Sequence, residues 1–329
     1  MELNDIAPMA EAVRLGEAAR GRTAPNPNVG CLIVRDGAIV GRGATAPGGR
    51  PHAEAVALAM AADTANSATL YTTLEPCSFI GRNPACAEMV IQAGVSRVLV
   101  GIADPDERVR GRGIKRMRAA GIEVIEGVRA NDVSAQLAPY IKHRTTGHPY
   151  VVLKMAMTFD GRTAAPDGTS RWITGPAARE DVHRLRAESD AVIVGAGTVL
   201  RDDPSLRVRL DGYAEDRSPR RVVLGSAPEN AKVRPALIWQ SDPVSLLDRL
   251  GNEGCLQVLL EGGAAVAGEW HRRKLVDSYI VYLAPAALGG DDGAPLFSGP
   301  GARSMEDVWR GSVVDVRQFG DDVRITVRP

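Results

Sequence analysis

Two short stretches decide how the first half of this chain folds: P-H-A-E at residues 51–54 and L-E-P-C-S-F-I-G-R-N-P-A-C at residues 74–86. Zinc prefers imidazole and thiolate ligands, and a catalytic zinc keeps three protein ligands and one open position for water. His52, Cys77 and Cys86 supply that set. Glu54 lies two residues beyond His52, where its carboxylate can reach the water without binding the metal. The pattern predicts a catalytic zinc site with Glu54 as its proton carrier.

An H-x-E triplet followed by P-C and a further cysteine is typical of zinc enzymes that hydrolyse an exocyclic amine of a nucleobase. Here eight residues separate Cys77 from Cys86, whereas the common signature has two. A purely structural zinc usually has four protein ligands. Cys31 lies within an apolar strand pattern and Cys255 just before another, so we expect both to be core residues. The sequence therefore favours a catalytic metal.

The segments around these stretches alternate between strand and helix patterns, which predicts an α/β layered domain. His52 falls at a helix start, Cys77 just after a strand and Cys86 near the start of the next helix. The positive end of a helix dipole favours thiolates. We expect helices over residues 8–20, 52–62, 84–94 and 111–120 and strands over residues 29–34, 38–43, 69–74, 98–102 and 122–125.

A polar stretch at residues 140–149 ends in proline, and we place a domain boundary there, with domains at 1–147 and 148–329. The second half again alternates, with no G-x-G-x-x-G to support a Rossmann fold. Gly-Gly at 262–263, between a strand and a helix, suits either a phosphate site or a plain turn. We expect strands over residues 151–155, 191–194, 221–224, 256–261 and 278–283 and helices over residues 181–188 and 264–275.

Length, composition and charge limit the functional classes to which this chain could belong. A chain of 329 residues suits two domains, and 44% apolar with 24% charged residues is ordinary for a globular protein. Lys and Arg (40) balance Asp and Glu (40), so no global field favours nucleic acid or an anionic membrane. No apolar run is long enough to span a bilayer, and the first twenty residues lack signal-peptide features. We expect a cytoplasmic protein without a disulfide framework.

The long cysteine spacing and N-P-N-V-G at residues 26–30 resemble the bifunctional deaminase–reductase family of riboflavin biosynthesis. The second half is similar to that family's reductase in L-K-M-A-M-T-F-D-G-R-T (153–163), S-R-W-I-T (170–174), V-G-A-G-T-V-L-R-D-D-P-S-L-R-V-R (194–209) and L-E-G-G (260–263). The resemblance implies a cytidine-deaminase-like three-layer domain followed by a dihydrofolate-reductase-like α/β domain.

The resemblance also implies the chemistry. The first domain would hydrolyse the exocyclic amine of a diaminohydroxy-phosphoribosylaminopyrimidine, using zinc. The second would reduce the ribosyl group to a ribityl chain, using NADPH. The substrate would be a small phosphorylated pyrimidine rather than a nucleic acid, and a homodimer or tetramer would fit the family.

Roles for individual residues follow from the same resemblance. His52, Cys77 and Cys86 would bind zinc, and Glu54 would carry the proton. Two further positions match substrate contacts of the deaminase, Asn26 for the pyrimidine and Arg82 for the phosphate. Six match NADPH contacts of the reductase: Ala156, Trp172, Thr198, Asp202, Ser226 and Gly263. Six match its substrate contacts: Lys154, Ser170, Arg186, Leu206, Arg209 and Glu261.

Three positions depart from the family pattern. Phe79 and Thr45 stand where histidines are common, so we expect pyrimidine recognition to be rearranged. Gly225 stands where an aspartate precedes Ser226. Two other functions stay open at this point. One is a nucleoside or tRNA deaminase with an appended domain, which the long cysteine spacing and neutral charge disfavour. The other is a non-catalytic ligand-binding protein with a structural zinc, in which Glu54 would have no chemical role.

Overall fold

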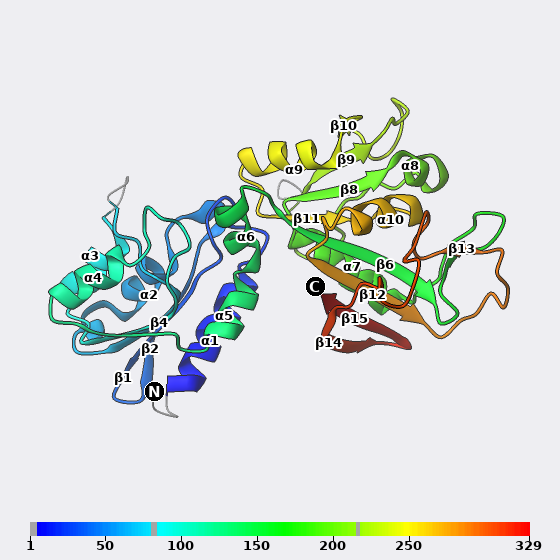
Figure 1. Cartoon of the computed structure of the whole chain (residues 1–329). Coiled ribbons are helices and arrows are strands. Elements are labelled where there is room, and N and C mark those ends of the chain that lie inside the picture. Colours follow the sequence, from blue (N-terminus) through cyan, green and yellow to red (C-terminus); the bar gives the residue numbers. More distant parts are fainter. Residues whose placement is uncertain (1–4, 80–83, 215–217) are drawn as a thin grey trace. The chain divides into compact units, whose positions relative to one another are not determined.

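The computed structural model describes residues 5–79, 84–214 and 218–329. The chain divides into two compact units, Met1–His148 and Pro149–Pro329 (Figure 1). Each unit has its own sheet with helices packed on it, so the expected α/β class is confirmed for both.

The first unit is built on a five-stranded sheet in the order β2-β1-β3-β4-β5. The β1–β2 hairpin and the β1–β3 pair are antiparallel, whereas β3, β4 and β5 run parallel. Loops that follow β3 and β4 therefore meet the segment that precedes β1 at one edge of the sheet. The strands are β1 (Gly30–Arg35), β2 (Ala38–Ala44), β3 (Thr69–Leu74), β4 (Arg97–Ile102) and β5 (Glu123–Glu126).

Glycines let two helices pack closely on opposite faces of this sheet. A Cβ on Gly30 would lie 1.8 Å from the carbonyl oxygen of Ala12 in α1 (Ile6–Ala18). A Cβ on Gly43 would lie 2.1 Å from the carbonyl oxygen of Ala53 in α2 (Ala53–Ala61). Gly43 pairs with Cys31, the neighbour of Gly30, so the two glycines face opposite sides. The result is three layers, helix on sheet on helix.

Two further helices, α3 (Cys86–Gln92) and α4 (Arg112–Ala119), lie close to each other in Figure 1. The polar stretch at residues 140–149, for which no helix was predicted, is helical over most of its length. Residues Ala138–Thr146 form helix α6, and Ala130–Gln136 form α5 just before it. The polar residues of that stretch lie on helical turns, and the helix ends at Gly147, which has φ +80°.

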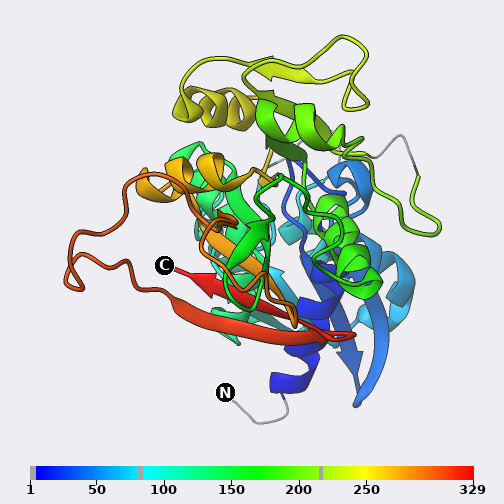
Figure 2. The same cartoon turned by 90° about the vertical axis from the view of Figure 1, so that its right-hand side faces the viewer.

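The second unit contains an eight-stranded sheet in the order β10-β9-β8-β11-β6-β12-β15-β14. The five central pairings from β10 to β12 are parallel, and β15 and β14 add an antiparallel hairpin at one edge (Figure 2). The strands are β6 (Tyr150–Thr158), β8 (Ala191–Gly195), β9 (Arg220–Leu224), β10 (Leu237–Trp239), β11 (Gln257–Leu260), β12 (Ser278–Ala284), β14 (Ser312–Phe319) and β15 (Asp322–Arg328).

Helices cover both faces of this sheet. Helices α9 (Pro243–Asn252) and α10 (Ala264–Arg272) pack on one face, where Trp270 is fully buried among aliphatic side chains. Helices α7 (Pro176–Ala187) and α8 (Ala196–Asp202) pack on the other face, around Val182 and Val199. The sequence patterns did not predict α8, α9, β10 or the β14–β15 hairpin, nor the short pair β7 (Arg162–Ala164) and β13 (Ala294–Pro295).

The close packing at Gly43 gives a test of the fold. Gly43→Ala places a methyl group against the Ala53 carbonyl and forces α2 away from β2. Overpacking of this kind costs about 1–3 kcal/mol, which we expect to lower the melting temperature by roughly 2–10 °C. Gly301→Ala is the matched control, since a Cβ there meets open space. Equal melting temperatures for the two variants would contradict this account of the packing.

Candidate zinc site and candidate reductase site

Three predicted ligands come together in the first unit. The ligand atoms of His52, Cys77 and Cys86 all lie within 4.8 Å of one another. The Nδ1 atom of His52 is 3.3 Å from the Cys86 sulfur and 3.7 Å from the Cys77 sulfur. One imidazole and two thiols at these separations fit a zinc ion with an open fourth position.

Local structure explains how residues so far apart in sequence converge. His52 is the residue before the first turn of α2, and Cys86 is the first residue of α3. The amide of Cys86 donates to the Cys77 sulfur at 3.3 Å, and the amide of Ala87 donates to the Cys77 carbonyl at 3.1 Å. Cys77 is thereby held at the start of α3, where the helix dipole favours a thiolate.

The surroundings shift the pKa values of Cys77 and Glu54 in opposite directions. Hydrogen bonds from Cys86 and from His52 lower the pKa of Cys77, although its partial burial opposes this. Glu54 is only 3% exposed. Burial, and then the charge of Cys77, raise the pKa of Glu54 to about 7. A carboxyl group with such a pKa can both accept and release a proton near neutral pH, which is what a proton carrier requires.

A cavity of about 240 Å³ opens beside the three ligands. Phe79 lines it and is 47% exposed, so an aromatic ring forms part of the wall. Arg50 brings a guanidinium to the same wall, which the sequence motifs did not single out although Arg50 lies only two residues before His52. The lining residues are Arg50, Pro51, His52, Ala55, Cys77, Phe79, Pro84, Cys86 and Met89.

The other deaminase positions have different surroundings. Asn26 is half-buried, and its side chain lies so close to Gly49 that a Cβ there would be 2.1 Å from the Asn26 amide nitrogen. Thr45 is buried and its hydroxyl accepts a hydrogen bond of 3.1 Å from the Val29 amide. Its role in the structure is to hold the segment that leads into β1. Arg82 lies outside the described residues.

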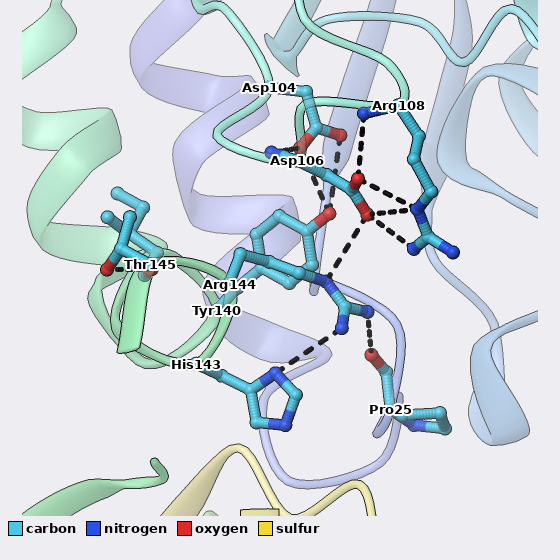
Figure 3. Close-up of polar contacts among 9 residues, drawn as sticks. Pro25, Asp104, Asp106, Arg108, Tyr140, His143, Arg144 and Thr145 are labelled. Carbon is cyan, nitrogen blue, oxygen red and sulfur yellow. Dashed lines mark hydrogen bonds and ion pairs between the residues drawn. The ribbon is translucent and has the colours of Figure 1, made fainter. Parts of the chain in front are cut away.

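Helix α6 secures the loops at this edge of the sheet (Figure 3). Arg144 donates to the carbonyl of Pro25, the neighbour of Asn26, at 3.2 Å and lies 3.8 Å from the Asp106 carboxylate. Tyr140 donates its hydroxyl to Asp104 at 3.1 Å. Burial raises the pKa of Asp104 to about 6. One helix thus ties together the loop before β1 and the loop after β4.

In the second unit, an ionic group lies between α7, the middle of β6 and the end of β11. Arg186 and Glu261 form a bidentate pair, with Nε–Oε1 at 2.6 Å and Nη2–Oε2 at 2.8 Å. Burial lowers the pKa of Lys154, which the positive charge of Arg186 lowers further and the negative charge of Glu261 raises. The structure therefore brings Lys154, Arg186 and Glu261 together, as the resemblance implied for a substrate site.

Two of the remaining substrate positions, Leu206 and Arg209, lie on a loop that is tied to this group. Arg186 also donates from Nη1 to the Arg207 carbonyl at 3.2 Å, which ties it to the loop of Leu206 and Arg209. Leu206 is buried, and Arg209 is exposed. Ser170 is half-buried in the loop before α7.

The predicted cofactor positions cluster at the carboxyl edge of the second sheet. Gly263 precedes α10, and a Cβ there would lie 3.7 Å from the Thr198 hydroxyl. Gly225 fits beside α8, since a Cβ there would lie 3.0 Å from that of Ala196. Ser226 follows β9 at this edge. The start of α10 beside Gly263 gives this edge a helix N-terminus with a small residue before it, which is a kind of site that can hold a phosphate group.

Three further cofactor positions extend from this edge. The carbonyl of Asp202 accepts a hydrogen bond of 2.5 Å from Arg171, which connects α8 to the loop of Trp172. Trp172 is 68% exposed and lies 4.3 Å from the Arg179 guanidinium. Ala156 lies in β6 and pairs with Tyr282.

Two family models match the chain. Residues 4–102 match the cytidine and deoxycytidylate deaminase zinc-binding region, and residues 149–325 match the RibD C-terminal domain. The riboflavin biosynthesis protein RibD of Escherichia coli is 38% identical, with 96% of each chain covered. RibD of Mycobacterium tuberculosis is 39% identical, covering 97% of this chain and 96% of its own.

This chain belongs to the RibD family. Solved structures agree over the whole length. Acinetobacter baumannii RibD has a TM-score of 0.91 at 36% identity, with 99% of each chain covered. A diaminohydroxyphosphoribosylaminopyrimidine deaminase/5-amino-6-(5-phosphoribosylamino)uracil reductase from Thermotoga maritima has a TM-score of 0.89 at 33% identity, also with 99% of each chain covered.

The family assignment confirms the two activities that the sequence predicted. The first unit is a zinc-dependent deaminase domain, and the second is a RibD reductase domain that uses NADPH. It supports this bifunctional identity over a nucleic-acid deaminase or a binding protein with structural zinc. No helix among the described residues is long and apolar enough to cross a membrane.

Removal of single thiols tests the metal site of this RibD family member. Cys86→Ala leaves two ligands, and we expect the zinc content of the purified chain to fall from about one per chain to about a tenth of that. Cys31→Ala is the matched control, because that thiol is fully buried in β1 and lies outside the ligand cluster. Zinc content by atomic emission decides the outcome, and full occupancy in Cys86→Ala would remove Cys86 from the ligand set.

Proposed function

We propose that this chain performs two successive steps on one phosphorylated pyrimidine. The first step hydrolyses the exocyclic amine of a diaminohydroxy-phosphoribosylaminopyrimidine, and the second reduces the ribosyl group of the product to ribityl. The main support is that the His52, Cys77 and Cys86 cluster with Glu54, and the buried Lys154, Arg186 and Glu261 group, occur in one chain. We place the functional boundary at 147/148.

The proposed deamination exchanges a C–NH₂ bond for a carbonyl and releases ammonia. Zinc held by the imidazole and two thiolates would supply Lewis-acid activation of water. Glu54 takes the proton of the attacking water on its carboxylate and transfers it to the leaving nitrogen. Its burial supports this role, because bulk water has little access to a carboxyl group that is only 3% exposed.

The cavity favours an aromatic and anionic substrate. Phe79 on the cavity wall offers a ring face to a pyrimidine. Asn26 is not among the lining residues, and we propose its contact with the pyrimidine from its family position alone. Arg50 places a cation on the wall, which suits the phosphate group, in addition to the role we propose for Arg82. Phe79 donates no hydrogen bond, so we propose that base selection relies on shape at that point.

The proposed reduction adds one hydride and one proton to the opened sugar. NADPH would bring the hydride, held by Thr198, Ser226 and Gly263 near its phosphates and by Ala156, Trp172 and Asp202 elsewhere. Lys154 holds a proton at Nζ, beside Glu261 and Arg186. Ser170, Leu206 and Arg209 complete the substrate contacts. A small-molecule pathway of this kind is consistent with our expectation of a cytoplasmic enzyme.

Replacement of Glu54 separates chemistry from metal binding. Glu54→Gln removes the proton carrier but no ligand, so we expect ammonia release to fall by roughly 10²- to 10⁴-fold while zinc content stays at the wild-type level. The reductase step, measured with the deaminated pyrimidine and NADPH, serves as an internal control and stays unchanged.

A second control is Glu88→Gln, since Glu88 lies on α3 and forms an ion pair with Arg116 outside the cavity. We expect it to keep full activity. Ammonia release at the wild-type rate in Glu54→Gln would remove Glu54 from the mechanism, and no NADPH oxidation by the wild type would remove the second step.

We also propose a homo-oligomer formed through β14. The face of the sheet that carries Trp270 and α10 continues across β12 and β15, because Val281 pairs with Ile325 and Ile325 with Val316. On the edge strand β14, Val313, Val314 and Val316 are 62%, 48% and 60% exposed. A long apolar edge strand offers unpaired backbone groups to another strand.

The order of residues in β14 favours a second copy of this chain as its partner. An antiparallel β14 pair related by a two-fold axis at Val316 places Val316 opposite itself. Asp315 of each copy then faces Arg317 of the other, so the charges are complementary in both halves of the pair. A single surface thus provides both partners.

Val316→Arg tests this surface by placing two like charges directly opposite each other across the pair. We expect a shift to the monomer mass in light scattering, with zinc content unchanged. Met60→Arg is the control. Met60 lies on α2 and is 58% exposed, close to the exposure of Val316, and we expect this variant to keep the wild-type mass. A monomeric wild type, or a Val316→Arg variant that keeps its mass, would contradict the proposed interface.

A further inference from the structure

The reductase unit contains a histidine that none of the motifs singled out. His183 lies on α7 three residues before Arg186, so the two side chains share one face of the helix. His183 is only 9% exposed. Its ring is directed at the loop that carries Leu206 and Arg209, two of the proposed substrate contacts.

The ring meets Arg209 twice. The Arg209 amide nitrogen lies 3.2 Å from Nδ1, and the Arg209 Nε atom lies 3.3 Å from Nε2. An imidazolium accepts at neither nitrogen, and a neutral imidazole accepts at one only. The ring is therefore neutral and accepts one of the two N–H groups; we assign the hydrogen bond to Nε–H at Nε2, while the amide packs against the ring. Burial, and then the charges of Arg186 and Arg209, lower the pKa of His183 to about 4, although Glu261 opposes this shift.

The two arginines beside this ring differ in their pairing. Arg186 uses two of its nitrogens on Glu261 and a third on the Arg207 carbonyl. Among the described residues, no carboxylate pairs with Arg209, and its side chain contacts His183 through Nε. The two terminal nitrogens of the exposed Arg209 thus remain available as a planar fork, which is the geometry that binds phosphate or paired oxygens.

The loop itself needs such support. Leu206 is buried with φ +53°, a left-handed conformation that a branched residue adopts at a cost. Arg186 donates to the backbone carbonyl of Arg207, which fixes the loop there. Two residues further on, the backbone amide of Arg209 lies against the His183 ring. Two residues of α7 therefore hold both the path of the loop and the direction of its cation.

We infer that His183 is a positioning residue of the reductase step, whose neutral imidazole accepts from the Arg209 side chain and so turns the guanidinium fork toward the substrate. The inference rests on the proposed function, in which Arg209 contacts the phosphorylated substrate. His183 touches neither substrate nor cofactor and transfers no proton.

The experiment is steady-state kinetics of the full chain with the deaminated pyrimidine and NADPH. His183→Leu keeps the bulk of the side chain and removes the acceptor. Because hydrogen bonds to charged groups are among the stronger ones, we expect KM for the pyrimidine to rise by roughly ten-fold. We expect kcat to change less than about two-fold and KM for NADPH to stay constant. A merely structural role would instead impair NADPH binding and kcat together.

Two comparisons sharpen the result. Glutamine can accept from Arg209 through its amide oxygen, so His183→Gln is expected to restore KM to within about three-fold of wild type. Arg209→Leu raises KM by itself, and we expect His183→Leu to add nothing in the double variant, because the two residues then act as one unit.

The outcomes separate this inference from the proposed function. If the wild type oxidises no NADPH with the pyrimidine, the proposed reduction fails. If the wild type is active but His183→Leu has the wild-type KM, or its effect adds fully to that of Arg209→Leu, the positioning role of His183 is overturned. Ammonia release by the first unit monitors the integrity of the chain in every variant.

Discussion

The close contact between α2 and the first two strands is the constraint on which the deaminase site depends. His52 and Glu54 can meet Cys77 and Cys86 only if the start of α2 lies close against the face of the sheet near the end of β3. Gly43 makes this possible, since a side chain there would collide with the Ala53 carbonyl. Position, burial and acidity of Glu54 all follow from that contact, because a carboxyl group held against a sheet is cut off from water.

Most of the first unit could be predicted from its sequence. The helical and strand patterns have clear periods there, and three zinc ligands with a carboxylate are rare by chance, so pattern and chemistry indicate the same place. Helix α6 escaped prediction because residues 138–146 carry many polar side chains, and their partners Pro25 and Asp106 lie far away in the sequence. Thr45 was likewise interpreted from its family position, whereas its hydroxyl serves the Val29 backbone.

The second unit shows the limits of sequence patterns more strongly. Its expected residues were assigned by resemblance, since charged loops and Gly-Gly turns have many uses. The structure adds a contact that sequence spacing does not reveal. Arg186 on α7 pairs with Glu261, which follows β11 and lies 75 residues later in the chain. The C-terminal hairpin was missed because β14 is exposed along nearly its whole length, so it has no alternation of buried and exposed residues. His183 belongs to no sequence motif, and its contact with Arg209 can be recognised only in the structure.

The contact of Arg144 with Pro25 joins the two ends of the first unit, because α6, its last helix, holds the loop that follows α1, its first helix. The minimal deaminase fragment is therefore longer than its zinc motif or the matched region to residue 102 would imply. A fragment that stops before α6 would keep every metal ligand and lose the tether of the Asn26 loop. The end of the catalytic unit is thus set by a helix that contains none of its proposed chemical groups.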